Sequence, residues 1–167
     1  MTRALAIAAT VALMAGAAPI SQAWAQAPAA APALPTYTAY GPNITLEQAL
    51  VVAEGAKAEA AKRKLPATIA IVDTSGALVY FQRGTGAPGT AEQFALRKAV
   101  AAVKERHATS VDQQRLKDSP GATPFLPDFF PFGGGFPLVI DGKVIGAIGE
   151  TGGADEDVAK AGVAALK

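Results

Sequence analysis

The segment that most constrains the fold is a glycine-rich pair of β-forming runs near the C-terminal end. The runs "FPLVI" (136–140) and "KVIGAIG" (143–149) are separated only by Asp141-Gly142. An Asp-Gly pair between two such runs is a strong signal for a tight hairpin, because both turn residues readily adopt positive φ. The segment therefore predicts two adjacent antiparallel strands.

A second hairpin is predicted earlier in the chain. The runs "ATIAIVD" (67–73) and "ALVYFQR" (77–83) are rich in β-branched and aromatic residues and are joined by Thr74-Ser75-Gly76. Two hairpins favour an antiparallel sheet, and the segments around them have helical patterns. The sequence therefore predicts an α+β domain with helices packed on the sheet, in the order α-β-β-α-α-β-β-α.

Four helices complete that order. Thr45 and Gln48 have capping-box spacing before an alanine-rich helical stripe that ends before Pro66, and Thr90 and Gln93 repeat the spacing before a second helix. A short third helix follows, with Thr109 or Ser110 as a candidate cap, and residues 154–167 form the last helix. The stretch 120–135 is predicted to be a loop.

The first residues are not part of this domain. Arg3 precedes an apolar run (4–18) that is shorter than the ~20 residues of a membrane span, and Ala23-Trp24-Ala25 has a cleavage pattern. We interpret residues 1–25 as a signal peptide, residues 26–43 as an Ala/Pro-rich spacer with mobile Tyr37 and Tyr40, and residues 44–167 as the folded domain. Periplasmic or secreted localisation follows, without membrane insertion after cleavage.

Composition excludes several classes of function. The full chain has a net charge of +1, and loss of Arg3 removes even that excess, so nucleic acid is not an expected partner. The chain has no cysteine, which rules out disulfides, zinc–thiolate sites and covalent haem attachment. It has one histidine, too few for a zinc hydrolase site, and no G-x-S-x-G motif for an esterase.

The glycines do not form a phosphate-binding loop. "FGGGFPLVI" leads into a strand rather than a helix, and "GAIGETGG" has the spacing G-x-x-G-x-x-G. The helix after it begins with Asp155, Glu156 and Asp157, whose charges repel phosphate. Phenylalanines surround the glycines instead. The loop is thus a buried turn, a wall for a planar apolar ligand or a subunit contact, and its phenylalanines are Phe125, Phe129, Phe130, Phe132 and Phe136.

The segments together resemble the GlcG/HbpS family of haem-binding domains, formerly called haem-degrading. The resemblance covers about 44–167 and depends on "ITLEQAL", "IAIVDTSGALVYFQR", "ALRKAVAAVKERHATS" and, above all, "FPFGGGFPLVIDGKVIGAIGETGGADEDVAKAGVAAL". It implies an α+β domain that forms homo-oligomers and binds haem non-covalently, for haem or iron carriage or for redox sensing with a sensor or receptor protein. Some relatives bind corrinoids, so a corrinoid is the alternative cofactor.

The chain departs from the family pattern at two places. Relatives commonly read K-A-x-T-A-x-x-F-G-x-P-T where this chain reads "KAVAAVKERHAT", so Glu105-Arg106 replaces Phe-Gly and Ala108 replaces Pro. Glu150 stands where an apolar residue is common before "TGG". The polar "KERH" motivates a third alternative, an interaction module that kept the fold without the ligand.

The resemblance implies haem but not its iron ligand, which varies within the family, so the candidate cofactor-binding residues come from the side chains present. His107 is the candidate iron ligand, because His, Cys, Met and Tyr are the usual axial ligands and Tyr80 is more typical of strand packing. Thr109, in the retained part of the motif, is the second candidate. For both, a solvated or capping role is the alternative. Arg97 and Lys98 are candidate partners of the propionates, unless they are ordinary surface charges, and the predicted ligand wall is Phe132, Gly133, Gly134 and Gly135.

No dedicated catalytic residue is predicted. Asp and Glu are plentiful, but nothing in the sequence selects a pair for glycoside chemistry. Any haem breakdown is expected to be coupled oxidation of bound haem by peroxide rather than dedicated enzyme catalysis.

Overall fold

The computed structural model describes residues 37–122 and 127–167. The predicted signal peptide (1–25), the first part of the predicted spacer and Phe125 lie outside these residues. Within them the element order is α-β-β-α-α-β-β-α around one antiparallel sheet, with a short 3₁₀ turn after the third helix. The predicted α+β fold and order of elements are confirmed.

Two hairpins make the sheet. The strands are β1 (Thr68–Asp73), β2 (Leu78–Gln82), β3 (Gly135–Ile140) and β4 (Lys143–Thr151). Their order in space is β2-β1-β4-β3, because β1 of the first hairpin pairs antiparallel with β4 of the second. In this register Ile69 lies beside Glu150, and Thr68 lies beside Thr151.

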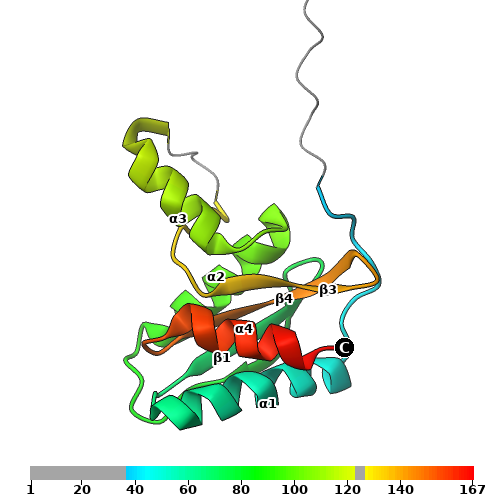
Figure 1. The fold of residues 1–167 in the computed structure, drawn as a ribbon, viewed down its shortest axis with the longest axis vertical. Coiled ribbons are helices and arrows are strands. Elements are labelled where there is room, and N and C mark those ends of the chain that lie inside the picture. The colour runs from blue at the N-terminus through cyan, green and yellow to red at the C-terminus, as the bar shows by residue number, and fades with distance from the viewer. Residues whose placement is uncertain (1–36, 123–126) are drawn as a thin grey trace, which may run out of the picture. The chain divides into compact units, whose positions relative to one another are not determined.

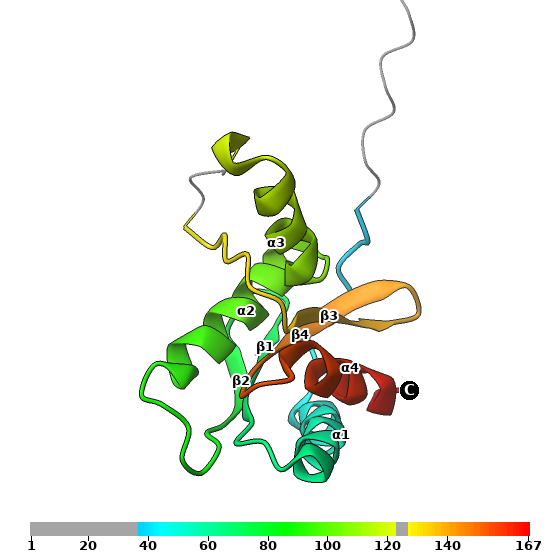
Figure 2. The same ribbon diagram turned by 60° about the vertical axis from the view of Figure 1, so that its left-hand side comes forward.

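Helices cover both faces of the sheet. The helices are α1 (Leu46–Arg63), α2 (Ala91–Glu105), α3 (Thr109–Asp118) and α4 (Asp155–Ala165). Figures 1 and 2 show α1 and α4 side by side on one face, α2 on the opposite face, and α3 extending away from the sheet. In the described part of the chain, no helix has the length and apolar character of a membrane span.

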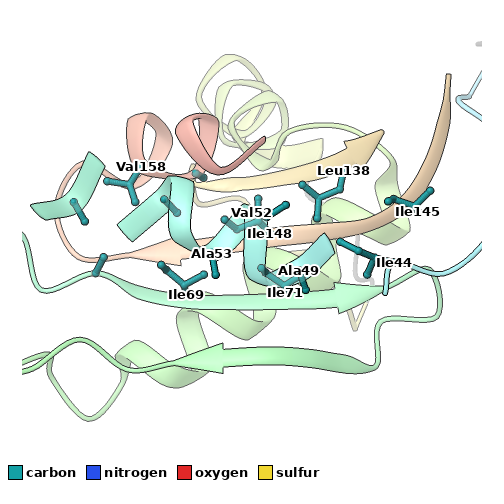
Figure 3. Close-up of a cluster of buried hydrophobic side chains, with 14 residues drawn as sticks. Ile44, Ala49, Val52, Ala53, Ile69, Ile71, Leu138, Ile145, Ile148 and Val158 are labelled. Carbon is teal, nitrogen blue, oxygen red and sulfur yellow. The ribbon is translucent and has the colours of Figure 1, made fainter. Parts of the chain in front are cut away.

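The main core lies between the sheet and the α1–α4 pair. Its larger members come from the sheet, whereas α1 contributes mainly alanines (Figure 3). Small side chains let α1 approach closely, and Gly55 of α1 leaves no room for a side chain, since an added Cβ would lie 2.6 Å from Ala165 Cβ. A second, smaller core of alanines and valines lies between α2 and the other face.

Of the two predicted capping boxes, one is present in the structure and the other is not. At α1 both hydrogen bonds of the Thr45–Gln48 capping box are present, at 3.2 and 3.0 Å, so that prediction is confirmed. Thr90 has helical φ and ψ and makes no capping bond, so the second predicted capping box is wrong. The hairpin turn is as predicted, with φ of 50° at Asp141 and 70° at Gly142.

The residues before α1 are held on the sheet. Gly41 N donates to Val144 O at 2.8 Å, and the Tyr40 hydroxyl donates to Val103 O at 2.8 Å. The Arg106 guanidinium lies over the rings of Tyr37 and Tyr40, 4.6 and 5.1 Å from their centroids. The end of α2 and strand β4 therefore contact this arm, which lies in the predicted spacer.

Candidate functional site

A pocket of about 460 Å³ lies where α2, the glycine-rich loop and the first turn of α4 meet. Such a volume is in the range of small-molecule sites, about 300–1,000 Å³. Three of the predicted cofactor-binding residues, Lys98, Phe132 and Gly133, contribute to it. The complete lining is Phe94, Lys98, Gln113, Phe132, Gly133, Thr151, Gly153, Ala154, Asp155, Glu156 and Asp157.

An aromatic cluster forms one side of the pocket. Phe132 lies 5.6 Å from Phe94 and 4.8 Å from Phe130, measured between ring centroids. Phe130 is buried, whereas Phe132 is 45% exposed, so the cluster has an anchored base and an open face. Arg97 is exposed on α2 and its guanidinium lies 4.3 Å from the Phe130 centroid. It therefore places a positive charge at the edge of the aromatic surface.

Thr109 fastens the glycine-rich loop to α3. Its hydroxyl donates to Phe132 O at 2.6 Å and accepts from Gly135 N at 3.0 Å. The residue is 1% exposed, and the N-cap of α3 is Ala108. The prediction of Thr109 as a helix cap is therefore wrong, and a ligand would reach its oxygen only by displacing the loop.

Two glycines of the loop are required by close packing. Gly134 has φ of +106°, and a Cβ there would lie 2.7 Å from Asp155 Cβ. A Cβ on Gly135 would lie 2.4 Å from Lys98 O. The loop therefore passes directly between α2 and α4. Of its three glycines, only Gly133 lines the pocket, and its φ is not positive. Gly134 and Gly135 shape the pocket wall from behind.

Lys98 is a buried cation at the inner wall of the pocket. It is 2% exposed, and its Nζ donates to Glu150 O at 2.9 Å, Asp155 Oδ2 at 2.5 Å and Thr151 Oγ1 at 3.4 Å. The interpretation of Lys98 as an ordinary surface charge is wrong. The reason is position: its helix face packs on the end of the sheet, where β4 and α4 supply acceptors.

Asp155 organises the turn between β4 and α4. Its Oδ1 accepts from Gly152 N at 3.0 Å and Gly153 N at 2.8 Å, while Oδ2 accepts from Lys98. Burial alone would raise the pKa of Asp155, but hydrogen bonds from Lys98 and from the two glycine amides hold it below its usual value. Asp155 is thus a carboxylate at neutral pH.

Glu150 lies next to the Lys98–Asp155 ion pair but, unlike these two residues, its side chain has no hydrogen-bond partner among the described residues. The residue is completely buried, and neither carboxyl oxygen receives a hydrogen bond from the described residues. Burial, with the neighbouring charge of Asp155, raises the pKa of Glu150 to about 8. Sequence reasoning noted that Glu150 replaces an apolar residue but assigned it no role, although a glutamate inside a glycine-rich β-run was the available signal.

His107 lies at the junction between α2 and α3 and does not line the pocket. Its Nδ1 lies 3.1 Å from Ala108 O, and its Nε2 lies 3.7 Å from Asp112 and 3.9 Å from Glu105. In residues 37–122 and 127–167 there is no group of three or more acidic, His or Cys residues arranged to hold a metal ion. The structure therefore brings Lys98, Phe132 and Gly133 together and leaves His107 apart.

Comparison with known proteins gives the family. A family model described as "Haem degrading protein HbpS-like" matches residues 44–166. An uncharacterised 15.0 kDa protein from the dhaT–dhaS intergenic region of Citrobacter freundii is 33% identical over 120 residues, which cover 68% of this chain and 83% of that protein.

Two solved structures show the same fold at higher than 25% identity. A double mutant of Streptomyces reticuli HbpS superposes with a TM-score of 0.69 at 32% identity, covering 84% of this chain and 99% of that one. PduOC in complex with haem gives a TM-score of 0.66 at 28% identity, covering 75% and 96%. The match to the family model spans the described domain from before α1 to the end of α4. This chain therefore belongs to the HbpS-like family.

Proposed function

We propose that this protein is an exported, non-covalent haem-binding protein that carries haem or senses its redox state. Family membership and the relative solved with haem support a tetrapyrrole as ligand. The observation that carries the proposal for this chain is the pocket with an open phenylalanine face beside a buried lysine. Bound haem would supply redox-active iron to a chain that has no cysteine.

The residues present fit a porphyrin ring by its face and its carboxylates. Phe132 and Phe94 offer an aromatic surface for a flat ring, and stacked or edge contacts with such rings are favourable. Arg97 at the edge of the cluster is available to a propionate, since it is exposed and its only charged or aromatic contact in the described chain is Phe130. The surface thus suits a planar, anionic ligand.

The iron ligand is the open part of the proposal. None of the residues that line the pocket is a histidine or tyrosine, so strong axial ligation by His107 would require the ligand to extend beyond this lining to the junction of α2 and α3. Thr109 is a weaker candidate, because its hydroxyl already holds the loop. We assign no catalytic residue, and peroxide-driven loss of haem would be coupled oxidation.

Titration with haemin tests the proposal. Phe132→Ala should weaken binding by at least about tenfold, because the exposed aromatic face is lost. Val139→Ala is the matched control, since Val139 is 43% exposed on β3 and does not line the pocket. A Soret band that neither shifts nor saturates near one haem per subunit would contradict the proposal.

The ligand variants separate the candidate iron contacts. His107→Ala should move the Soret band and leave the fold intact if His107 binds iron, and an effect of Thr109→Ala alone would move the ligand to Thr109. A parallel titration with cobalamin decides the corrinoid alternative. Binding of neither tetrapyrrole would favour an interaction module.

Export has its own test. Mass spectrometry of protein from the periplasm or medium should show a chain that begins at Gln26. A chain that keeps Met14 would contradict cleavage after Ala25.

A further inference from the structure

Glu150 needs an explanation that its packing does not provide. A completely buried carboxyl without a hydrogen-bond donor is costly, and such groups gather at functional sites. Glu150 lies two residues after Ile148, a core residue of the α1–α4 face, so its side chain points to the same face. It therefore reaches the underside of the turn that Asp155 organises.

Two charged groups act on Glu150 in the described chain, and both belong to the pocket. Asp155 of α4 is negative, and Lys98 of α2 is positive. The other elements packed on this face contribute uncharged neighbours: β1 places Ile69 beside Glu150, and the buried positions of α1 are alanine and valine. Glu150 is therefore coupled to the Lys98–Asp155 pair rather than to solvent.

Within the described chain, the hydrogen bond available to Glu150 requires it to be an acid. As a carboxylate it receives no hydrogen bond from the described residues, but as a carboxylic acid it can donate to the neighbouring Asp155 carboxylate. Asp155 then has donors from Glu150, Gly152 and Gly153 besides Lys98. The arrangement is an acid–carboxylate pair next to an ammonium group.

With this arrangement, Lys98 can leave Asp155 for a ligand carboxylate without leaving the Asp155 carboxylate short of hydrogen-bond donors. All three hydrogens of the Lys98 ammonium group have acceptors, of which Asp155 is the only charged one, so a ligand carboxylate that takes the place of this counter-ion must compete with Asp155. If Lys98 turns to the ligand, Asp155 keeps the two glycine amides and the acid hydrogen of Glu150. Ionised Glu150 would instead add a second negative charge beside Lys98 and hold it inward.

We propose that Lys98 recognises a carboxylate of the ligand in this pocket, and that Glu150, as a neutral acid bonded to Asp155, allows Asp155 to release it. The inference rests on the proposed function, because the carboxylates in question are those of a tetrapyrrole. Lys98 is the recognition group, and Glu150 acts through Asp155 as a positioning residue.

The first experiment uses the ligand-free protein. The side-chain carboxyl ¹³C resonance of Glu150, assigned by its absence from Glu150→Gln, should titrate with a midpoint near pH 8. A midpoint near the ordinary 4.5 would overturn the inference, because Glu150 would then be ionised at neutral pH. This measurement does not depend on haem.

The second experiment measures haemin affinity against pH. In the wild type it should fall by about fivefold between pH 8 and 9, as the Glu150 proton is lost. In Glu150→Gln, whose amide donates to Asp155 at every pH, the affinity should stay constant over that range. Haemin dimethyl ester, which has no carboxylate, should bind both proteins without this dependence.

The outcomes are separable. A wild-type affinity that does not change with pH, or an equal slope in Glu150→Gln, would overturn the role of Lys98 and Glu150. Absence of haemin binding at every pH would refute the proposed function and the role of Lys98 with it, while the ¹³C titration still decides the state of Glu150.

Discussion

At the scale of single residues, Thr109 shows how a side chain far from the loop in sequence fixes the pocket wall. Its hydroxyl bonds Phe132 O and Gly135 N, which come from a segment more than twenty positions later. Both partners are main-chain groups, and the Thr109 side chain that joins them is buried, so its hydroxyl is not readily replaced by water. The position of Phe132 therefore depends on Thr109.

Replacement of Thr109 by valine should destabilise the fold. Valine keeps the shape but leaves Gly135 N–H and Phe132 C=O without partners, at a cost of about 1–3 kcal/mol. Thr109→Ser, which keeps the hydroxyl, should lose much less. Urea unfolding of the three proteins measures the difference, and equal stabilities of the valine variant and the wild type would show that the bonds contribute nothing.

Glu150 should make stability depend on pH in an unusual direction. Its pKa is about 8 when folded and near 4.5 when unfolded, so between these values the folded state keeps a proton that the unfolded state releases. Its contribution to stability is thus complete below pH 4.5 and is lost as pH rises to about 8. The pKa of Asp155 is lowered, so its contribution to stability is present above its usual value of 3.8 and is lost only as the pH falls below that value.

Glu150→Gln removes this titration. The variant should gain stability relative to the wild type progressively from pH 5 to pH 8, by a few kcal/mol in total. Chemical denaturation at pH 5, 6.5 and 8 measures the gain. A difference that is the same at all three values would contradict a raised pKa.

Single-residue roles were the least predictable part of the site. Lysine in a helix is usually exposed, and the burial of Lys98 depends on acceptors from β4 and α4 that lie over fifty positions away. The Thr109 pattern looks the same whether its hydroxyl caps a helix or fastens a loop. Local spacing holds no information on which distant main chain will approach.

At the scale of elements, local signals predicted most of the fold. The Thr45 capping box and the Asp141-Gly142 turn depend on neighbours within four residues, and both are confirmed. The predicted capping box at Thr90 is absent, because the chain enters α2 from a turn in which Thr90 already has helical φ and ψ. The arm before α1 was missed since its partners, Val144 and Arg106, come from other elements.

The end of α2 gives a prediction about this arm. Arg106 has φ of +58°, a conformation that disfavours side chains by about 1 kcal/mol or more and suits glycine. The contacts of its guanidinium with Tyr37, Tyr40 and Thr38 O offset that cost. Arg106 thus has a strained backbone conformation, and its side chain holds the arm before α1 in place.

Two variants separate these effects. Arg106→Ala loses the contacts and keeps the strained φ, whereas Arg106→Gly loses the contacts and relieves it. We expect the alanine variant to be less stable than the glycine variant by about 1 kcal/mol in thermal or urea unfolding. Equal stability of the two would show that the backbone there is not strained.

At the scale of the whole molecule, we expect a homo-oligomer. Phe132 and Val139 are exposed apolar residues on the loop and on edge strand β3, and association is a usual way to cover such surface. Not all of the phenylalanines predicted for this contact are available at the surface, because Phe130 is buried and Phe136 packs on the core. Light scattering at micromolar concentration should give two or more subunits, and a monomer mass would contradict this expectation.

The central claim is that the tetrapyrrole binds between α2, the glycine-rich loop and α4. It is tested most directly by amide chemical shifts of ¹⁵N-labelled protein titrated with zinc protoporphyrin, which is diamagnetic. The account predicts the largest changes at pocket residues such as Phe94, Gly133 and Gly153. Changes confined to β2 or to the C-terminal end of α4, with these three amides unmoved, would contradict it.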